Sequence, residues 1–108
     1  MQKVLKILLI RFSSIGDIVL TTPVVRCLKT QLNVELHYIT KERYASILFT
    51  NPYLDKVHIL NNDINKTITT LKKENYDYII DLHNNLRSRL VTLNLRVKSK
   101  RYFKSNFN

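Results

Sequence analysis

Residues 4–23 read VLKILLIRFSSIGDIVLTTP and join a dense apolar run to the only glycine of the chain, Gly16. The run at residues 4–10 is aliphatic on both faces at all positions but one, which is typical of a central strand in a parallel sheet. Helical periodicity over residues 18–32 then predicts a helix directly after this strand. Pro23 lies inside that helix, so we expect a kink or an irregular first turn there.

The rest of the chain repeats the alternation of strand and helix patterns. Further strands are predicted at residues 35–40, 56–60, 76–82 and 98–103, and helices at residues 42–49, about 63–74 and 86–97. Connections of roughly 2–6 residues between them are typical of α/β units. The pattern therefore predicts an α/β fold, a Rossmann-like parallel sheet with flanking helices, in a single domain.

Composition narrows the class of protein. The 108 residues suffice for one domain, and no apolar run approaches the ~20 residues that span a bilayer. Cys27 is the only cysteine, which excludes a disulfide scaffold and fits a reducing, cytoplasmic compartment. Because Cys27 stands in an apolar-periodic stretch, we expect it to be buried.

Positive charge gathers at the end of the sequence. The formal net charge is +10, and seven of these positive charges lie in the last 22 positions, which contain no acidic residue. The basic residues there are Arg87, Arg89, Arg96, Lys98, Lys100, Arg101 and Lys104. Such a segment attracts phosphorylated sugars, anionic lipid headgroups or nucleic acid. For Arg87, phosphate recognition and a solvated helix face remain equal alternatives, whereas we expect Arg89 to be simply solvated.

The passage from the first strand into the next helix predicts a ligand site. Ligands bind outside the carboxyl ends of parallel strands, where Gly16 lets the backbone turn tightly and approach a ligand. The N–H groups at the helix start favour an anion, and Ser13 and Ser14 add hydroxyl donors. The patterns G-x-G-x-x-G and G-x-x-x-x-G-K-[ST] are absent, so neither a dinucleotide site nor a P-loop is indicated.

Two groups of polar residues in these loops have alternative interpretations. Asp17 either stabilises the start of the helix, by about 0.5–2 kcal/mol, or serves as a general base at the mouth of the crevice. After the strand at residues 76–82, His83 either contacts a ligand or bonds locally to the neighbouring aspartate. One of Asn84 and Asn85 is expected to cap the next helix.

The histidines do not indicate a metal site. His37 and His58 lie in the middle of predicted strands, so we interpret both as structural. Together with His83 they show no spacing typical of a set of metal ligands.

Two longer patterns resemble a known family. Residues 6–29, KILLIRFSSIGDIVLTTPVVRCLK, and residues 76–89, YDYIIDLHNNLRSR, are similar to the amino-terminal signature and the fourth strand of glycosyltransferase family 9. These are the ADP-heptose:lipopolysaccharide heptosyltransferases. One departure is that His83-Asn84-Asn85 stands where family members often carry a glycine.

The resemblance implies a two-domain GT-B fold, with residues 1–108 forming part of the amino-terminal, acceptor-side domain. The carboxy-terminal domain, which would bind the ADP-heptose donor, is then missing from this sequence, so we expect the chain to be a fragment without transferase activity of its own. The family's general base falls on Asp17, and no metal or other cofactor is implied.

The resemblance also implies substrate-binding residues and partners. The substrate-binding positions fall on Ser13, Ser14, Gly16, His83, Asn84, Asn85, Arg87 and Ser88. The acceptor would be a lipid-linked core oligosaccharide, and the basic carboxy-terminal segment would favour peripheral contact with the cytoplasmic face of the inner membrane.

Two other functions remain open from the sequence. The chain would be a non-catalytic α/β module that binds anionic sugar phosphates or lipid headgroups through its basic segment, or a small nucleic-acid-binding protein. A solvated edge strand, which basic residues often protect, is the plain alternative for that segment.

Overall fold

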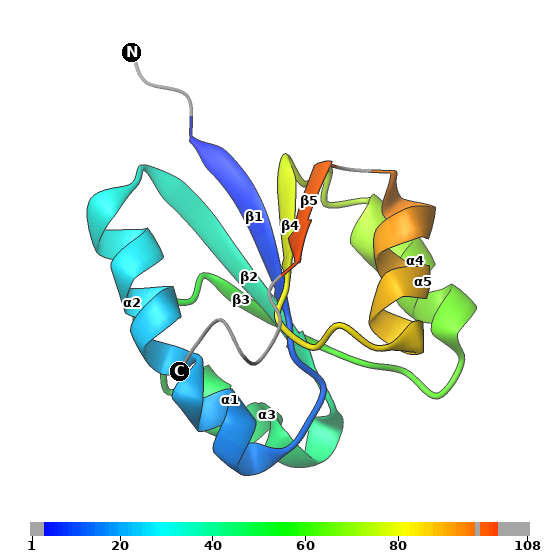
Figure 1. Ribbon diagram of the computed structural model, residues 1–108, viewed down its shortest axis with the longest axis horizontal. Helices are drawn as coiled ribbons and strands as arrows, with labels where there is room; N and C mark the ends of the chain where they lie inside the picture. The colour runs from blue at the N-terminus through cyan, green and yellow to red at the C-terminus, as the bar shows by residue number, and fades with distance from the viewer. Residues whose placement is uncertain (1–3, 97, 102–108) are drawn as a thin grey trace.

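The computed structural model of the chain describes residues 4–96 and 98–101 and shows a parallel sheet with helices on both faces (Figure 1). Its elements are β1 (Leu5–Ile10), α1 (Ile15–Leu20), α2 (Thr22–Gln31), β2 (Val34–Thr40), α3 (Glu42–Phe49), β3 (Lys56–Ile59), α4 (Ile64–Lys72), β4 (Tyr78–Asp81), α5 (Leu86–Leu95) and β5 (Lys98–Arg101). The strands within this part of the chain lie in the order β3-β2-β1-β4-β5. The predicted fold class, a Rossmann-like sheet of the kind found in the amino-terminal half of GT-B enzymes, is confirmed.

The strand order reverses beside β1. The chain runs from β1 to β2 and β3 on one side and then crosses to β4 and β5 on the other. Ile10, the last residue of β1, is in register with Asp81, the last residue of β4. Their carboxyl ends point to the lower edge of Figure 1. In open α/β sheets ligands bind at this reversal, so the space beside the carboxyl ends of β1 and β4 is the candidate binding crevice.

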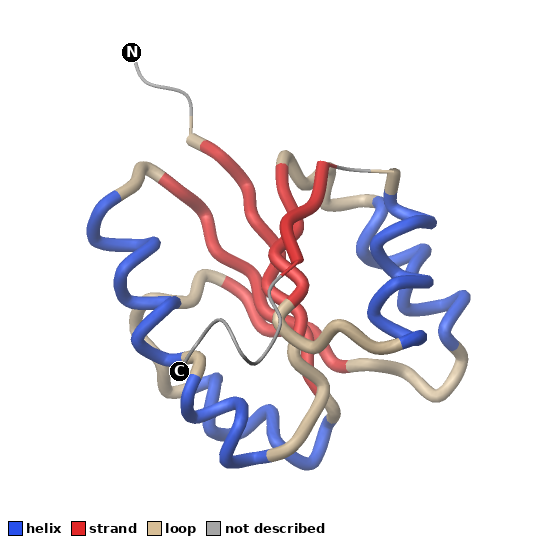
Figure 2. Tube along the Cα trace, viewed as in Figure 1, coloured by secondary structure: helices blue, strands red, loops and turns tan. Residues whose placement is uncertain are grey.

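The sheet separates two hydrophobic layers (Figure 2). Helices α1, α2 and α3 cover one face, and α4 and α5 cover the other. Successive residues of β1 alternate between them, because Leu9 packs in the first layer while Leu8 and Ile10 pack in the second. All three side chains are fully buried. This double-sided burial explains why β1 is aliphatic at every position except Lys6.

The helix predicted over residues 18–32 is two helices, α1 and α2. They meet at Thr21, whose hydroxyl donates to the Ile18 carbonyl at 2.6 Å and lies 2.8 Å from the Tyr38 hydroxyl. Pro23 falls in the first turn of α2, where the missing N–H costs little. The predicted common apolar face is therefore interrupted, and Val19 is 47% exposed.

Cys27 is exposed, so the prediction that it is buried is wrong. After the break at Thr21, α2 turns Val25 into the sheet, where it is fully buried. Two residues further along a helix is about 200° of rotation, which carries Cys27 to the opposite face.

The end of the basic segment lies partly outside the described residues. The predicted last strand appears as β5, whose register with β4 begins at Lys98 opposite Tyr78. The rest of that strand, at residues 102 and 103, and Lys104 are not described, and neither are the side chains beyond Arg96. Over the described ranges, no helix is both long and apolar enough to cross a membrane.

Candidate functional site

A buried arginine joins the two loops that flank the strand-order reversal. Arg11 follows β1 directly and is only 5% exposed. Its Nη1 donates to the carbonyl of Leu82, just after β4, at 2.9 Å. Its Nη2 lies 2.9 Å from Oδ2 of Asp17. The guanidinium thereby fixes Asp17 relative to the end of β4, because each of its two terminal nitrogens contacts one of the two loops.

Asp17 lies close to the strand-order reversal, because Arg11 connects it to the residue that follows β4. It is the third residue of α1, and its Oδ2 also accepts a hydrogen bond from the Ser14 hydroxyl at 2.9 Å. The side chain is 30% exposed, so it is neither sealed in the interior nor on the far edge of the sheet. Both interactions engage the same oxygen, which orients the carboxylate group as a whole.

The residues before Asp17 form an open surface. Ser14 is the N-cap of α1, the peptide bond between Ser13 and Ser14 is cis, and both Ser14 and Gly16 are exposed. The expectation that Gly16 is needed for a tight turn is wrong, because it is the second residue of α1 and its φ is not positive. A Cβ placed at Gly16 would meet nothing within 4 Å. The glycine therefore leaves open space rather than relieving backbone strain.

The second loop is built around the buried carboxylate of Asp81. Its Oδ1 accepts hydrogen bonds from the backbone N–H groups of His83 at 3.0 Å and Asn84 at 2.8 Å. Its Oδ2 accepts the Ser88 hydroxyl at 2.8 Å. Asn85 caps α5 as predicted, and it exchanges hydrogen bonds with Ser88 in a capping box. These bonds fix the path of the loop.

Ser88 does not face the crevice. It is fully buried, and its hydroxyl is engaged by Asp81 and Asn85. The expectation that Ser88 contacts a substrate is therefore corrected: it shapes the loop that carries the other candidates.

His83 and Asn84 lie in the outer part of this loop, and Arg87 follows it in the first turn of α5. Asn84 has a φ of 53°, a left-handed conformation that asparagine tolerates better than most residues, so the absence of a glycine here causes no conflict. The His83 ring packs against Phe12, with 5.1 Å between ring centroids. The Arg87 guanidinium lies 5.6 Å from the centroid of the same Phe12 ring, within cation–π range. Phe12 thus links the loop after β1 to the loop after β4.

A basic cavity of about 460 Å³ opens next to this loop. It is lined by Lys41, Glu42, Arg43, Leu60, Asn61, Asn62 and Arg87. Three cationic side chains face one carboxylate there, so the cavity suits an anionic group. Arg87 belongs to its lining whereas Asp17 does not.

The fold thus brings the predicted residues into two facing groups. Ser13, Ser14, Gly16 and Asp17 stand after β1, and His83, Asn84, Asn85 and Arg87 stand after β4. Arg11 and Phe12, which hold the two groups together, were not predicted from the sequence. The available signal for Arg11 was a charged residue placed directly after the apolar residues 7–10.

No family model matches the chain. It is 30% identical over 106 residues to lipopolysaccharide heptosyltransferase 1 of Campylobacter coli, an alignment that covers 92% of this chain and 30% of that relative. The chain thus spans about a third of the length of the curated relative that it matches.

Solved structures share the fold. A glycosyl transferase of family 9 from Veillonella parvula DSM 2008 has a TM-score of 0.82 at 18% identity, over 96% of this chain and 37% of that chain. The E. coli ADP-heptose lipopolysaccharide heptosyltransferase II has a TM-score of 0.78 at 22% identity, over 90% of this chain and 30% of that chain. In sequence and in fold, the chain resembles the amino-terminal part of the heptosyltransferases of glycosyltransferase family 9.

Proposed function

We propose that this chain forms the acceptor-side part of a family 9 glycosyltransferase that transfers heptose from ADP-heptose to the inner core of lipopolysaccharide. Its sequence is 30% identical to a lipopolysaccharide heptosyltransferase over 106 residues. The observation that carries the proposal is the position of Asp17, which a buried arginine ties to the carboxyl end of β4 where the strand order reverses. That is the place where α/β sheets of this kind bind ligands.

Asp17 acts in this proposal as the general base. Its carboxylate takes the proton of an acceptor hydroxyl while the oxygen attacks the anomeric carbon of the heptose. A carbon–oxygen bond forms on one face as the bond to the diphosphate breaks on the other, so ADP leaves and the configuration inverts. Arg11 is a positioning residue, because it holds the carboxylate through Oδ2 at 2.9 Å.

The two loops divide the binding of the acceptor between them. Ser13, Ser14 and Gly16 present hydroxyls and open backbone beside the base. Across the crevice, His83, Asn84 and Asn85 offer polar groups to the sugar. Arg87, at the basic cavity, offers two parallel N–H donors to a phosphate of the acceptor.

The donor and the cellular setting follow from the same proposal. ADP-heptose would bind mainly to a carboxy-terminal domain outside these 108 residues, in keeping with the 30% of the relative's length that the chain covers. The enzyme would act in the cytoplasm at the inner leaflet, where the acceptor is anchored. The basic carboxy-terminal segment would draw it to the anionic membrane surface.

Acceptor binding by the 108-residue chain tests the acceptor-side assignment. We expect a phosphorylated core oligosaccharide to bind, and the Arg87→Ala variant to weaken binding by about 1.5–3 kcal/mol through loss of a charge-assisted contact. Arg26→Ala is the control, because it removes the same charge from an exposed position of α2 that does not line the basic cavity. Equal losses in both variants, or equal retention of any polyanion, would favour a non-catalytic polyanion-binding module instead.

Transferase assays add a second test. With ADP-heptose and acceptor, the 108-residue chain is expected to show no turnover, because it covers only 30% of the length of the heptosyltransferase that it resembles. Measured turnover by this chain alone would refute the proposal that donor binding requires a further domain.

A further inference from the structure

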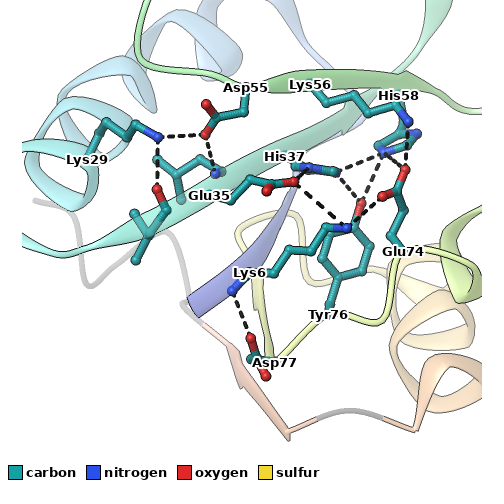
Figure 3. A network of polar contacts seen from close by, with 12 residues as sticks. Lys6, Lys29, Glu35, His37, Asp55, Lys56, His58, Glu74, Tyr76 and Asp77 are labelled. Atoms are coloured by element: carbon teal, nitrogen blue, oxygen red, sulfur yellow. Dashed lines mark hydrogen bonds and ion pairs between the residues drawn. The ribbon is translucent and has the colours of Figure 1, made fainter. Parts of the chain in front are cut away.

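A second polar cluster lies away from the crevice, on the face of the sheet that α4 and α5 cover (Figure 3). His37 comes from β2 and His58 from the neighbouring edge strand β3. Glu74 and Tyr76 come from the connection between α4 and β4. The sequence indicated only two separate structural histidines. The parallel pairing of β2 with β3 places both of them on the same face of the sheet.

The two histidine rings point ring nitrogens at each other. His37 Nδ1 lies 3.2 Å from His58 Nε2, and the Tyr76 hydroxyl lies 2.8 Å from the first nitrogen and 3.0 Å from the second. His37 is 1% exposed and His58 is 8% exposed, so both side chains are shielded from bulk water. Two such nitrogens can share a hydrogen bond, with the Tyr76 hydroxyl as a further partner, or they can both bind one cation.

Glu74 completes a set of donors. Its Oε2 lies 3.7 Å from His58 Nε2, and one donor atom from each of His37, His58 and Glu74 falls within 4.8 Å of the others. Zinc–nitrogen bonds of about 2.0–2.1 Å in a tetrahedron place two nitrogens roughly 3.3 Å apart. The observed 3.2 Å separation of the ring nitrogens matches that edge.

We propose that His37 Nδ1, His58 Nε2 and Glu74 form a site for a divalent transition metal such as Zn²⁺. Imidazole and carboxylate ligands suit this class of ion. The three side chains come from β2, from β3 and from the connection before β4, so the fold itself brings the donor atoms together.

The outer shell of a metal site is also in place. Glu35 Oε2 lies 2.6 Å from His37 Nε2, the nitrogen that faces away from the cluster. This carboxylate–histidine arrangement orients the ring and leaves the lone pair on Nδ1 for the metal. A cavity of about 120 Å³, lined in part by His58, Thr67 and Leu71, lies beside the cluster on the side of His58.

Two lysines limit the affinity of the site. Lys56 Nζ lies 2.7 Å from Glu74 Oε2, and Lys6 Nζ lies 2.8 Å from Glu74 Oε1. Because a divalent ion must share Glu74 with these ammonium groups, their repulsion weakens its binding. Lys56 is 55% exposed and can turn into solvent, whereas Lys6 is 25% exposed and also faces Glu35.

The metal would serve the fold rather than the transfer reaction. Its ligands join the edge strand β3 to the connection before β4, which are not neighbours in the sheet. A bound ion would hold β3 in place and make the stability of the domain depend on metal. The proposal is independent of Asp17 and of acceptor binding.

Metal titration of the untagged 108-residue chain tests the site. We expect one Zn²⁺ or Co²⁺ per chain, a tetrahedral Co²⁺ spectrum without a thiolate charge-transfer band, and a higher melting temperature with metal than with chelator. His58→Ala should weaken binding by about 100-fold or more, since losing an outer-shell partner alone costs 10–100-fold. His83→Ala, which removes the third histidine, should bind as the unchanged chain does.

Removal of a lysine is the more decisive test, because the proposal predicts that it strengthens metal binding. Lys56→Gln should tighten metal binding by about tenfold, as one repelling charge is lost. Lys72→Gln removes an equal charge from an exposed position of α4 and should leave the affinity unchanged. Absence of specific binding, wild-type affinity in His58→Ala, or equal affinities in the two lysine variants would each overturn the proposal.

Discussion

Simultaneous removal of the Asp81 carboxylate and the Ser88 hydroxyl probes how the second loop is built. Asp81 is fully buried and accepts three hydrogen bonds, from two backbone N–H groups and from Ser88. Asp81→Ala leaves all three donors without this acceptor and is expected to cost about 3 kcal/mol of folding free energy. Ser88→Ala loses the bond to Asp81 and half of the capping box, which we expect to cost about 2 kcal/mol.

The two substitutions should be coupled in their effects on the free energy of unfolding. The bond from Ser88 Oγ to Asp81 Oδ2, 2.8 Å long, is counted in both single variants but can be lost only once. A hydrogen bond to a charged group contributes about 1.5–3 kcal/mol. The double variant should therefore be more stable than the sum of the single costs predicts, by about 1–2 kcal/mol.

Urea unfolding of the four proteins, followed by circular dichroism, measures this coupling. Asp81→Ala combined with Thr50→Ala is the control, because Thr50 ends α3 on the opposite face of the sheet and bonds only locally, to the Ile47 carbonyl, in the contacts described for it. That pair should be additive within about 0.5 kcal/mol. If Asp81 and Ser88 were equally additive, the reasoning that one shared bond shapes the loop would be refuted.

Other measurements address the rest of the molecule. Burial raises the pKa of Tyr38 from 10.0 to about 12. Between these two pH values the folded chain keeps a proton that the unfolded chain loses. The contribution of Tyr38 to the free energy of unfolding is therefore fully present below pH 10 and falls by about 2–3 kcal/mol toward pH 12. Unfolding titrations should show a smaller alkaline loss in Tyr38→Phe, and an equal loss would contradict the assignment. Asp63 caps α4 through its bond to the Asn65 N–H, so Asp63→Ala should cost about 1 kcal/mol in chemical denaturation, and no change would argue against the cap.

Local patterns were sufficient for most of the fold. The strand predicted at residues 4–10 is β1, and the helix predicted at residues 42–49 is α3 with the same bounds. In both segments the apolar spacing and the flanking residues favour the same element, so tertiary contacts had nothing to override. The parallel sheet then follows from the alternation of strands and helices.

The interruption at Thr21 shows where local patterns fail. Apolar periodicity continues through residues 18–32, yet the chain ends α1 and restarts as α2 because Thr21 and Pro23 favour a new first turn. The restart changes which residues face the sheet, and this is why the prediction for Cys27 was wrong.

Only part of the candidate site could be predicted from the sequence. Asp17 and the loop after β4 are local motifs, but the bond from Arg11 to Leu82 joins residues 71 positions apart. That contact depends on β1 lying beside β4, which is a property of strand order rather than of either loop. The meeting of His37 with His58 depends in the same way on the pairing of β2 with β3.

The general-base role of Asp17 is tested most directly in a complete enzyme. The chain would replace the matching amino-terminal segment of a family 9 heptosyltransferase, and ADP release with acceptor would be measured for the unchanged chimera and for its Asp17→Asn variant. We expect the unchanged chimera to turn over and the variant to lose kcat by about 10²–10⁴-fold, the range for a general base, while binding the acceptor equally well. An unchanged kcat in Asp17→Asn, or a chimera that binds both substrates without turnover, would contradict the account.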